Sequence, residues 1–175
     1  MIVLTVPGIG GSGPEHWQSR WEALHADTHR VEQADWGKPW LADWLSRLDA
    51  AVANAGPDCV LVAHSLGCLL VAHWAAGYPQ PIRGALLVAV PDPAAPAFPT
   101  EAAEFTLPQQ ALPFPALMVA SRDDPYADFA FSERAARVWG AELVDAGARG
   151  HLNAASGLAA WPEGWALLER WSSDA

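Results

Sequence analysis

Short apolar runs rich in β-branched residues alternate with longer amphipathic stretches along nearly the whole chain, and this alternation most limits the possible folds. Such a pattern is typical of parallel strands joined by helical crossovers. We expect an α/β fold with about six mostly parallel strands and helices on both faces of the sheet. The expected strands are residues 2–6, 30–34, 59–64, 85–90, 116–121 and 142–145. The expected helices are residues 14–26, 39–54, 66–77, 128–139 and 161–171.

Chain length points to one domain spanning residues 1–175, because 175 residues with 51% hydrophobic content suit a single core. For the helix expected at 14–26, Ser12 and Glu15 have the spacing of a capping box, and Pro14 suits a first helical turn. Residues 91–115 are rich in proline, which neither a helix nor a central strand tolerates well. We expect this stretch to be a long surface loop or a short lid.

The charge balance excludes several classes of partner. Ten Lys and Arg residues against twenty Asp and Glu residues give a net charge of −10, without a basic cluster, so neither nucleic acid nor an anionic membrane is an expected partner. The apolar residues 1–6 are only as long as a strand, which favours a cytoplasmic protein without an anchor. Cys59 and Cys68 lie in apolar runs, where we expect free buried thiols, and no spacing suggests a metal site. No cofactor is expected.

The clearest chemical motif lies where the run at 59–64 meets the helix expected at 66–77. Ala63, Ser65 and Gly67 match the nucleophile elbow G-x-S-x-G, with alanine in place of the first glycine. The elbow needs small residues two positions either side of the serine, so that strand and helix can approach each other. An ordinary Ser-Leu-Gly turn without chemistry is the alternative. The motif and its strand-to-helix setting favour Ser65 as a nucleophile.

A nucleophilic serine needs a base and an orienting acid, and in this architecture they follow it in the order acid, then histidine. Asp123 and Asp124 follow the apolar run at 116–121, and His151 stands in a glycine-rich turn before the last helix. We expect His151 to be the base. Asp124 is favoured as the acid because Pro125 would hold it in a rigid turn, while Asp123 is the alternative or a helper.

For the other histidines we expect structural roles. His64 adjoins Ser65, so we expect its side chain to point away along the strand. His25, His29 and His73 fit structural positions on helices or strand edges.

Several blocks of the chain, in order, resemble one known family. The segments VPGIGGSGPEHWQSRWE, LVAHSLGCLL, SRDDPY, GHLNAASG and WPEGW are similar to those of the small serine hydrolases of the retinoblastoma-binding protein nine and YdeN group, within the α/β-hydrolase fold. The resemblance spans nearly the whole chain. It implies a sheet of order 2-1-3-4-5-6 without a separate cap domain, and a triad of Ser65, Asp124 and His151.

The glycine-rich loop after the first strand has two interpretations. Gly8, Gly10 and Gly13 have the spacing of a dinucleotide-binding fingerprint, and Glu32 or Asp35 would be its acidic residue. In α/β hydrolases, however, this loop supplies an amide to the oxyanion hole. The resemblance favours the second interpretation. It makes the N–H groups of Ile9 and Leu66 the expected oxyanion donors.

Four residues after the first two strands are candidates for the substrate pocket, because they lie near the carboxyl edge of the sheet: His16, Trp17, Asp35 and Trp36. Core packing of the tryptophans and local capping by His16 are the alternatives.

Together these features predict a serine hydrolase, esterase-like, that cleaves a small acyl substrate through a Ser-His-Asp triad and a covalent acyl-enzyme. A serine peptidase or aminopeptidase-like activity and a non-catalytic binding module of the same fold are the alternatives. We expect a monomer or a homodimer.

Overall fold

The computed structural model describes residues 1–78 and 80–174, and the strands and helices alternate along them. The strands are β1 (Ile2–Val6), β2 (Thr28–Arg30), β3 (Cys59–His64), β4 (Gly84–Val88), β5 (Ala116–Ala120) and β6 (Glu142–Asp145). The helices are α1 (Trp17–Leu24), α2 (Leu41–Ala55), α3 (Leu66–Gly77), α4 (Phe129–Trp139) and α5 (Pro162–Asp174), with short 3-10 turns η1 (Thr100–Ala102) and η2 (Ala154–Ser156).

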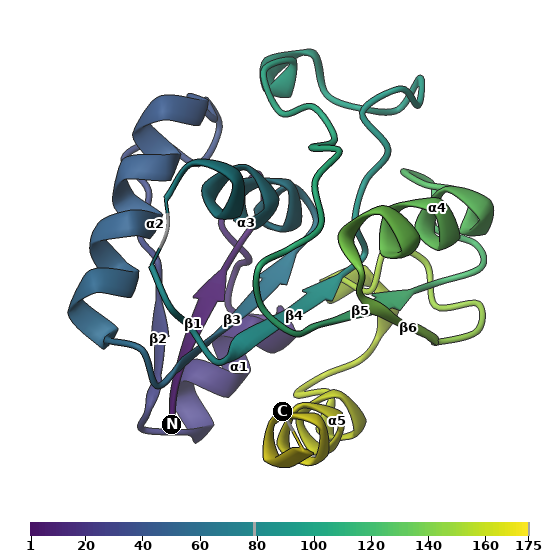
Figure 1. Cartoon of the computed structure of the whole chain (residues 1–175). Helices are drawn as coiled ribbons and strands as arrows, with labels where there is room; N and C mark the ends of the chain where they lie inside the picture. The colour runs from purple at the N-terminus through teal and green to yellow at the C-terminus, as the bar shows by residue number, and fades with distance from the viewer. Residues whose placement is uncertain (79, 175) are drawn as a thin grey trace.

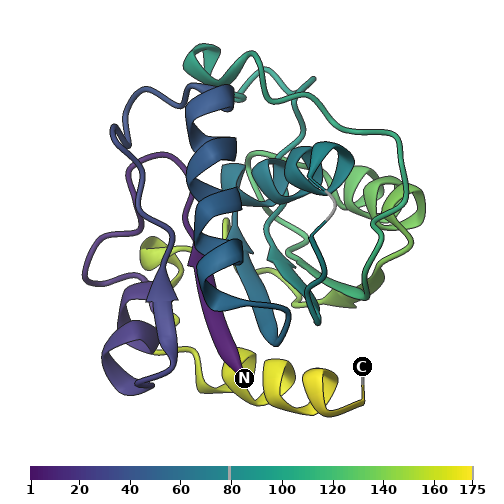
Figure 2. The ribbon, with the colours of Figure 1, turned by 60° about the vertical axis from the view of Figure 1, so that its left-hand side comes forward.

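All six strands run parallel in one sheet of order β2-β1-β3-β4-β5-β6, as expected. Helices α2, α3 and α4 cover one face, and α1 and α5 cover the other (Figures 1 and 2). Because all six strands are parallel, their carboxyl ends lie at the same edge of the sheet. Loops that follow different strands meet there, which is where α/β proteins build their sites.

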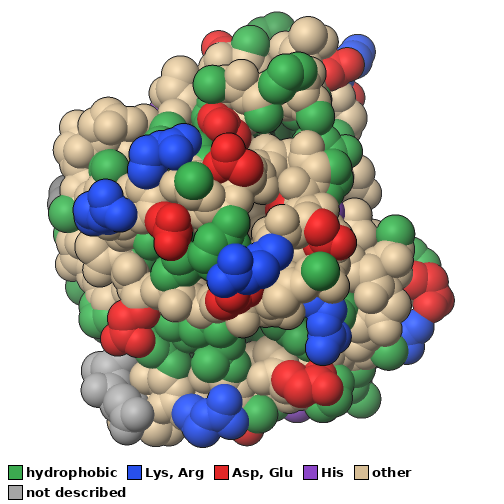
Figure 3. All heavy atoms as spheres, turned by 90° about the vertical axis from the view of Figure 1, so that its right-hand side faces the viewer, with side chains coloured by type: hydrophobic (Ala, Val, Ile, Leu, Met, Phe, Trp, Pro, Cys, Tyr) green, Lys and Arg blue, Asp and Glu red, His purple; other side chains and the backbone are tan. Residues whose placement is uncertain are grey.

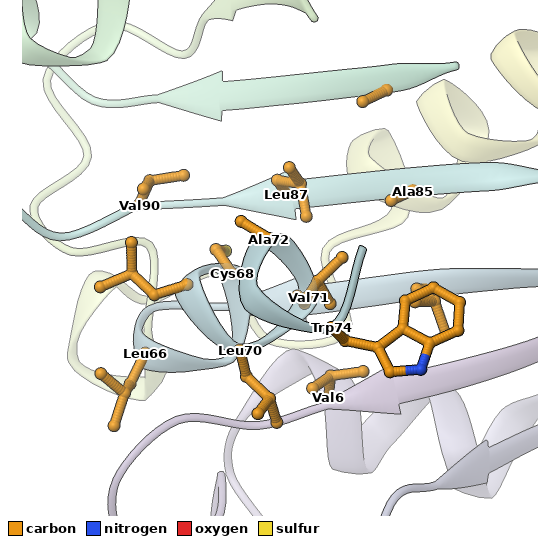
Figure 4. Packing of buried hydrophobic residues seen from close by; sticks show 14 of the residues in the cluster. Val6, Leu66, Cys68, Leu70, Val71, Ala72, Trp74, Ala85, Leu87 and Val90 are labelled. Carbon is orange, nitrogen blue, oxygen red and sulfur yellow. The ribbon is translucent and has the colours of Figure 1, made fainter. Parts of the chain in front are cut away.

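The core is centred on β3 and α3. All six residues of β3 are buried, as expected for a central parallel strand that is covered on both faces. Helix α3 is buried on almost every side, and its Cys68, Leu70 and Trp74 pack among residues of β1 and β4 (Figure 4). The nucleophile elbow joins these two elements, so it is anchored in the buried core. Both cysteines are buried free thiols, as predicted.

The second strand lies earlier in the chain than expected. Residues Thr28–Arg30 pair with Val3–Thr5, whereas the sequence suggested 30–34. Val31 is buried, but only its N–H reaches the sheet, donating a hydrogen bond to Thr5 O at 2.9 Å. The chain leaves the sheet directly after Arg30. The observed strand at this edge therefore consists of the polar residues Thr28, His29 and Arg30.

Helix α1 starts later than expected, and its cap is a different residue. Pro14 and Glu15 lie in a turn before the helix, and His16 is the N-cap, its Nδ1 accepting a hydrogen bond from Gln18 N–H at 3.2 Å. Ser12 cannot cap because its backbone is left-handed (φ 48°), and its hydroxyl donates to Gln18 Oε1 instead. The expected capping box is therefore wrong.

The proline-rich residues 91–115 form a long irregular segment that contains η1, without a cap domain inserted into the described chain. None of the described helices is long and apolar enough to cross a membrane. On the face that carries α4 and β6, Lys and Arg side chains are scattered among Asp and Glu side chains (Figure 3). That face has no patch of a single sign.

Candidate active site

Ser65 occupies a strained backbone position at the junction of β3 and α3. Its φ of 55° and ψ of −124° lie in a region that residues with a Cβ rarely adopt. Such strain costs about 1–3 kcal/mol and persists only where the surroundings impose it. Here the sharp turn raises Ser65 above the carboxyl end of the central strand, at the N-terminus of α3, as a nucleophile elbow requires.

Close backbone packing explains the small residues of the elbow. A Cβ on Gly67 would lie 2.1 Å from Val6 O, so no larger residue fits where α3 passes β1. A Cβ on Gly8 would lie 3.1 Å from Leu66 N and 3.1 Å from Ser65 Cβ. The glycine-rich loop is therefore folded against the elbow itself, with Leu66 and Val6 close by (Figure 4).

Three side chains from separate loops form a continuous hydrogen-bonded row. His151 Nε2 lies 2.8 Å from Ser65 Oγ, and His151 Nδ1 lies 2.9 and 3.0 Å from the two carboxylate oxygens of Asp124. The side chains of His151 and Asp124 are only 8% and 4% exposed. Tyr126 N–H donates to Asp124 Oδ1 at 2.9 Å, which orients the carboxylate. The arrangement has the order and distances of a serine–histidine–acid triad.

Asp123 has a different partner from Asp124. Its Oδ1 accepts hydrogen bonds from Gly150 N–H at 2.7 Å and from Ser121 Oγ at 2.8 Å, and these bonds lower the pKa of Asp123. Ser121 Oγ in turn accepts from Arg149 N–H at 2.8 Å. The loop after β5 is thus joined to the loop that holds the histidine. Asp123 connects the two loops, while Asp124 contacts the imidazole.

A cavity of about 640 Å³ opens beside Ser65 and His151. Its walls come from the glycine-rich loop, from the proline-rich segment and from the loops after β5 and β6. The lining includes Ile9, Ser12, His16, Leu66, Phe98, Glu101, Tyr126 and Asn153. Glu101 is the only Asp, Glu, Lys or Arg among the lining residues that the structure describes.

The comparisons with known proteins decide the family. The model of the serine hydrolase family matches residues 3–170. The chain belongs to the serine hydrolase family. A YdeN-like hydrolase from Pectobacterium atrosepticum is 30% identical, with a TM-score of 0.88 over 98% of this chain and 90% of that one. The ydeN gene product of B. subtilis is 24% identical, with a TM-score of 0.81 over 98% of both chains.

More distant structures share the fold of this serine hydrolase. Thermogutta terrifontis esterase 2 is 14% identical, with a TM-score of 0.71 over 99% of this chain and 82% of that one. Comparison with curated protein sequences finds no match.

Both expected oxyanion donors of this serine hydrolase lie at the cavity. Ile9 and Leu66 line it, and neither backbone N–H has a hydrogen-bond acceptor in the part of the chain that the structure describes. Helix α1 begins at Trp17, so no helix starts at the second glycine of the loop, as a dinucleotide fingerprint would require. The contact of Gly8 with the elbow suits the hydrolase interpretation of this loop.

Of the four residues suggested for the pocket of this serine hydrolase, only His16 lines the cavity. Trp17 is 1% exposed and packs in the core against Trp21. Asp35 Oδ1 accepts hydrogen bonds from the N–H groups of Gly37 and Lys38 in its own loop. Trp36 packs against Trp44. These three side chains therefore have packing or turn roles.

Sequence reasoning missed two neighbours of His151 in this serine hydrolase. His64 was expected to point away, yet its ring lies 5.0 Å from that of His151 and its Nε2–H donates to His151 O at 2.9 Å. Burial and the adjacent His16 and His151 lower the pKa of His64 well below its ordinary value. Tyr126 packs 4.5 Å from the His151 ring. Only the short DDPY block, which contains Tyr126, carried a signal for either residue.

Two of the remaining histidines, His25 and His73, have structural contacts. His25 stacks on Trp165 with ring centroids 3.4 Å apart, and His73 Nε2 lies 3.0 Å from Thr106 O. Among the residues that the structure describes, no three His, Cys, Asp or Glu side chains are grouped to hold a metal ion.

Proposed function

We propose that this serine hydrolase is a carboxylesterase that cleaves small acyl esters through Ser65, His151 and Asp124. The observation that carries the proposal is the row in which Ser65 Oγ, His151 Nε2, His151 Nδ1 and the Asp124 carboxylate lie within 3.0 Å of each next partner. A serine hydroxyl is a weak nucleophile until an oriented base takes its proton. The strained elbow and the open cavity beside it leave Ser65 accessible to a substrate.

In the first half of the reaction His151 Nε2 takes the proton of Ser65 Oγ as that oxygen attacks the ester carbonyl. The carbonyl π electrons move to its oxygen, and the N–H groups of Ile9 and Leu66 stabilise this oxyanion. The tetrahedral intermediate collapses, the bond to the alkoxy group breaks, and His151 gives its proton to the leaving alcohol. Asp124 holds the imidazole in the tautomer with hydrogen on Nδ1 and stabilises the imidazolium.

In the second half His151 removes a proton from water, which attacks the acyl-enzyme carbonyl. Collapse of the second tetrahedral intermediate breaks the bond to Ser65 Oγ. The proton held by His151 returns to this oxygen, and the carboxylic acid leaves. Each step balances with water as the only co-reactant.

The cavity lining supports a neutral substrate. Glu101 places one negative charge there, and no Lys or Arg among the described lining residues would balance a negatively charged acyl group. The whole chain carries a net charge of −10, which also repels anionic ligands over longer range.

Labelling with a fluorophosphonate probe, read by intact mass, tests the proposal. We expect one adduct on the wild type, no adduct on Ser65→Ala, and labelling reduced on the order of 10⁴-fold in His151→Ala. Ser173→Ala, which removes an exposed serine on α5, is the matched control and should label like the wild type. A folded wild type that stays unlabelled would overturn the proposal and favour a binding module.

A further inference from the structure

His16 is a buried polar side chain in the wall of the cavity, and one of its ring nitrogens has no protein partner among the described residues. It is 4% exposed and lines the cavity next to Ser65. Its Nε2 has no hydrogen-bond partner among the described residues. Buried polar atoms are nearly always paired, so an unpaired one on a residue of the cavity wall points to a ligand group that pairs with it.

The protonation of this ring follows from its neighbours. Gln18 N–H donates to His16 Nδ1 at 3.2 Å, so Nδ1 bears the lone pair and the hydrogen of the neutral ring sits on Nε2. Burial, and then the charges of Arg30 and His151, lower the pKa of His16 to about 4. At neutral pH the ring is uncharged. Its Nε2 is therefore a hydrogen-bond donor and cannot accept.

The ring is also held in place. It packs 4.6 Å from the ring of His64 and 5.1 Å from that of Trp17, and its Nδ1 is tied to the first turn of α1. His64 in turn contacts His151. A donor whose direction is fixed before binding loses little conformational entropy when it pairs.

We propose that His16 Nε2–H binds a neutral oxygen acceptor of the substrate, separate from the ester group that is cleaved. The enzyme would therefore select esters that carry this additional oxygen over esters whose chains are purely hydrocarbon. The inference rests on the proposed esterase function. The scissile carbonyl oxygen has its own expected donors, Ile9 and Leu66, so the His16 donor is left for a second oxygen. That oxygen is an ether, carbonyl or hydroxyl group rather than a carboxylate, because Glu101 lines the same cavity.

Two pairs of esters that differ by one CH₂-to-O exchange test this selection on either side of the scissile bond. On the acyl side, p-nitrophenyl 3-methoxypropanoate is compared with p-nitrophenyl pentanoate. On the alcohol side, 2-methoxyethyl acetate is compared with butyl acetate. We expect the wild type to favour the ether ester in one of the pairs by about 3- to 10-fold in kcat/KM, the range for one neutral hydrogen bond.

Two variants of His16 separate the donor from the helix cap. In His16→Asn, Oδ1 still caps α1, but the amide is too short to reach the position of Nε2. In His16→Gln, the longer amide restores an N–H near that position but loses the cap. We expect His16→Asn to bring the ether preference close to one, and His16→Gln to keep part of it. Thermal unfolding of both variants reports the effect on the cap.

The outcomes are distinguishable from failure of the proposed function. If the wild type cleaves all four esters with equal kcat/KM within each pair, the inference is wrong and the esterase stands. An ether preference that survives in folded His16→Asn also overturns the inference, because another group must then be the donor. If the wild type neither cleaves an ester nor takes a fluorophosphonate label, the proposed function itself fails.

Discussion

Asp123 accepts a 2.7 Å hydrogen bond from the backbone N–H of Gly150, the residue that precedes His151. The neighbouring Asp124 contacts the imidazole of His151 directly. Two adjacent carboxylates therefore act on the same histidine in different ways, one through its backbone and one through its ring.

Substitutions at these two aspartates should have effects of different size. Asp124→Asn removes the charge and the acceptor that fix the His151 tautomer, so we expect kcat to fall on the order of 10⁴-fold. Asp123→Ala only loosens the loop before His151, and we expect a loss of about 10-fold, mostly in kcat. Ester hydrolysis under saturating substrate checks both.

The conservative variant Asp123→Asn serves as the control. Its Oδ1 can still accept from Gly150 N–H, so activity near that of the wild type is expected. A loss in Asp123→Asn as large as in Asp124→Asn would show that the charge of Asp123 matters, against the positioning role.

Gly67→Ala should destabilise the fold more than any other exchange of glycine for alanine on α3. Its Cβ would meet Val6 O at 2.1 Å, and backbone atoms cannot move aside cheaply. We expect a loss of at least about 3 kcal/mol in the free energy of unfolding, measured by urea denaturation. Gly77→Ala, at the end of the same helix, meets no atom within 4 Å. That control should be neutral or more stable by up to about 1 kcal/mol.

Stability should fall on acidification because His16 is buried in its neutral form. Its pKa is about 4 in the folded protein, against 6.5 as the ordinary value expected for the unfolded chain. A lowered folded pKa means that the unfolded state binds the proton first. The contribution is complete above pH 6.5 and is lost as the pH falls towards 4, by up to about 3 kcal/mol.

Urea denaturation at pH 7 and pH 4.5 measures this pH dependence. The drop in the free energy of unfolding should be smaller in His16→Asn than in the wild type. His29→Asn, on the exposed side of β2, is the control and should keep the wild-type drop. Equal drops in all three proteins would contradict the assignment to His16.

Glu101 should disfavour anionic substrates. We expect kcat/KM to be higher for p-nitrophenyl butyrate than for mono-p-nitrophenyl succinate. Glu101→Gln should lower the ratio of these two kcat/KM values by about 3- to 10-fold at low salt. Glu142→Gln removes a charge at the opposite end of the sheet, at the start of β6, and should leave the ratio unchanged. A ratio that is the same in Glu101→Gln and the wild type would mean that this carboxylate lies too far from the bound acyl group.

The sequence was sufficient for the parallel sheet because each buried strand is a continuous apolar run, and for the sharp turn at Ser65 because an elbow needs small residues at fixed spacing. The order of serine, acid and histidine along the chain indicated His151 as the candidate base. The contact between His64 and His151 could not be predicted, since no sequence motif links these two residues, which lie 87 positions apart. Trp17 was misplaced for a similar reason. From the sequence alone, an aromatic residue next to a loop cannot be assigned to the core or to a cavity wall.

The sheet distributes the proposed catalytic groups unevenly between its centre and its edge. Ser65 follows the fully buried β3, whereas the loop that carries His151 follows β6, an edge strand whose four residues are all at least partly exposed. Edge strands open locally at a lower free energy than the global unfolding transition. Amide hydrogens of β6 should thus exchange with solvent sooner than those of β3. On heating, the histidine would leave the serine while the central sheet is still intact, so inactivation precedes melting.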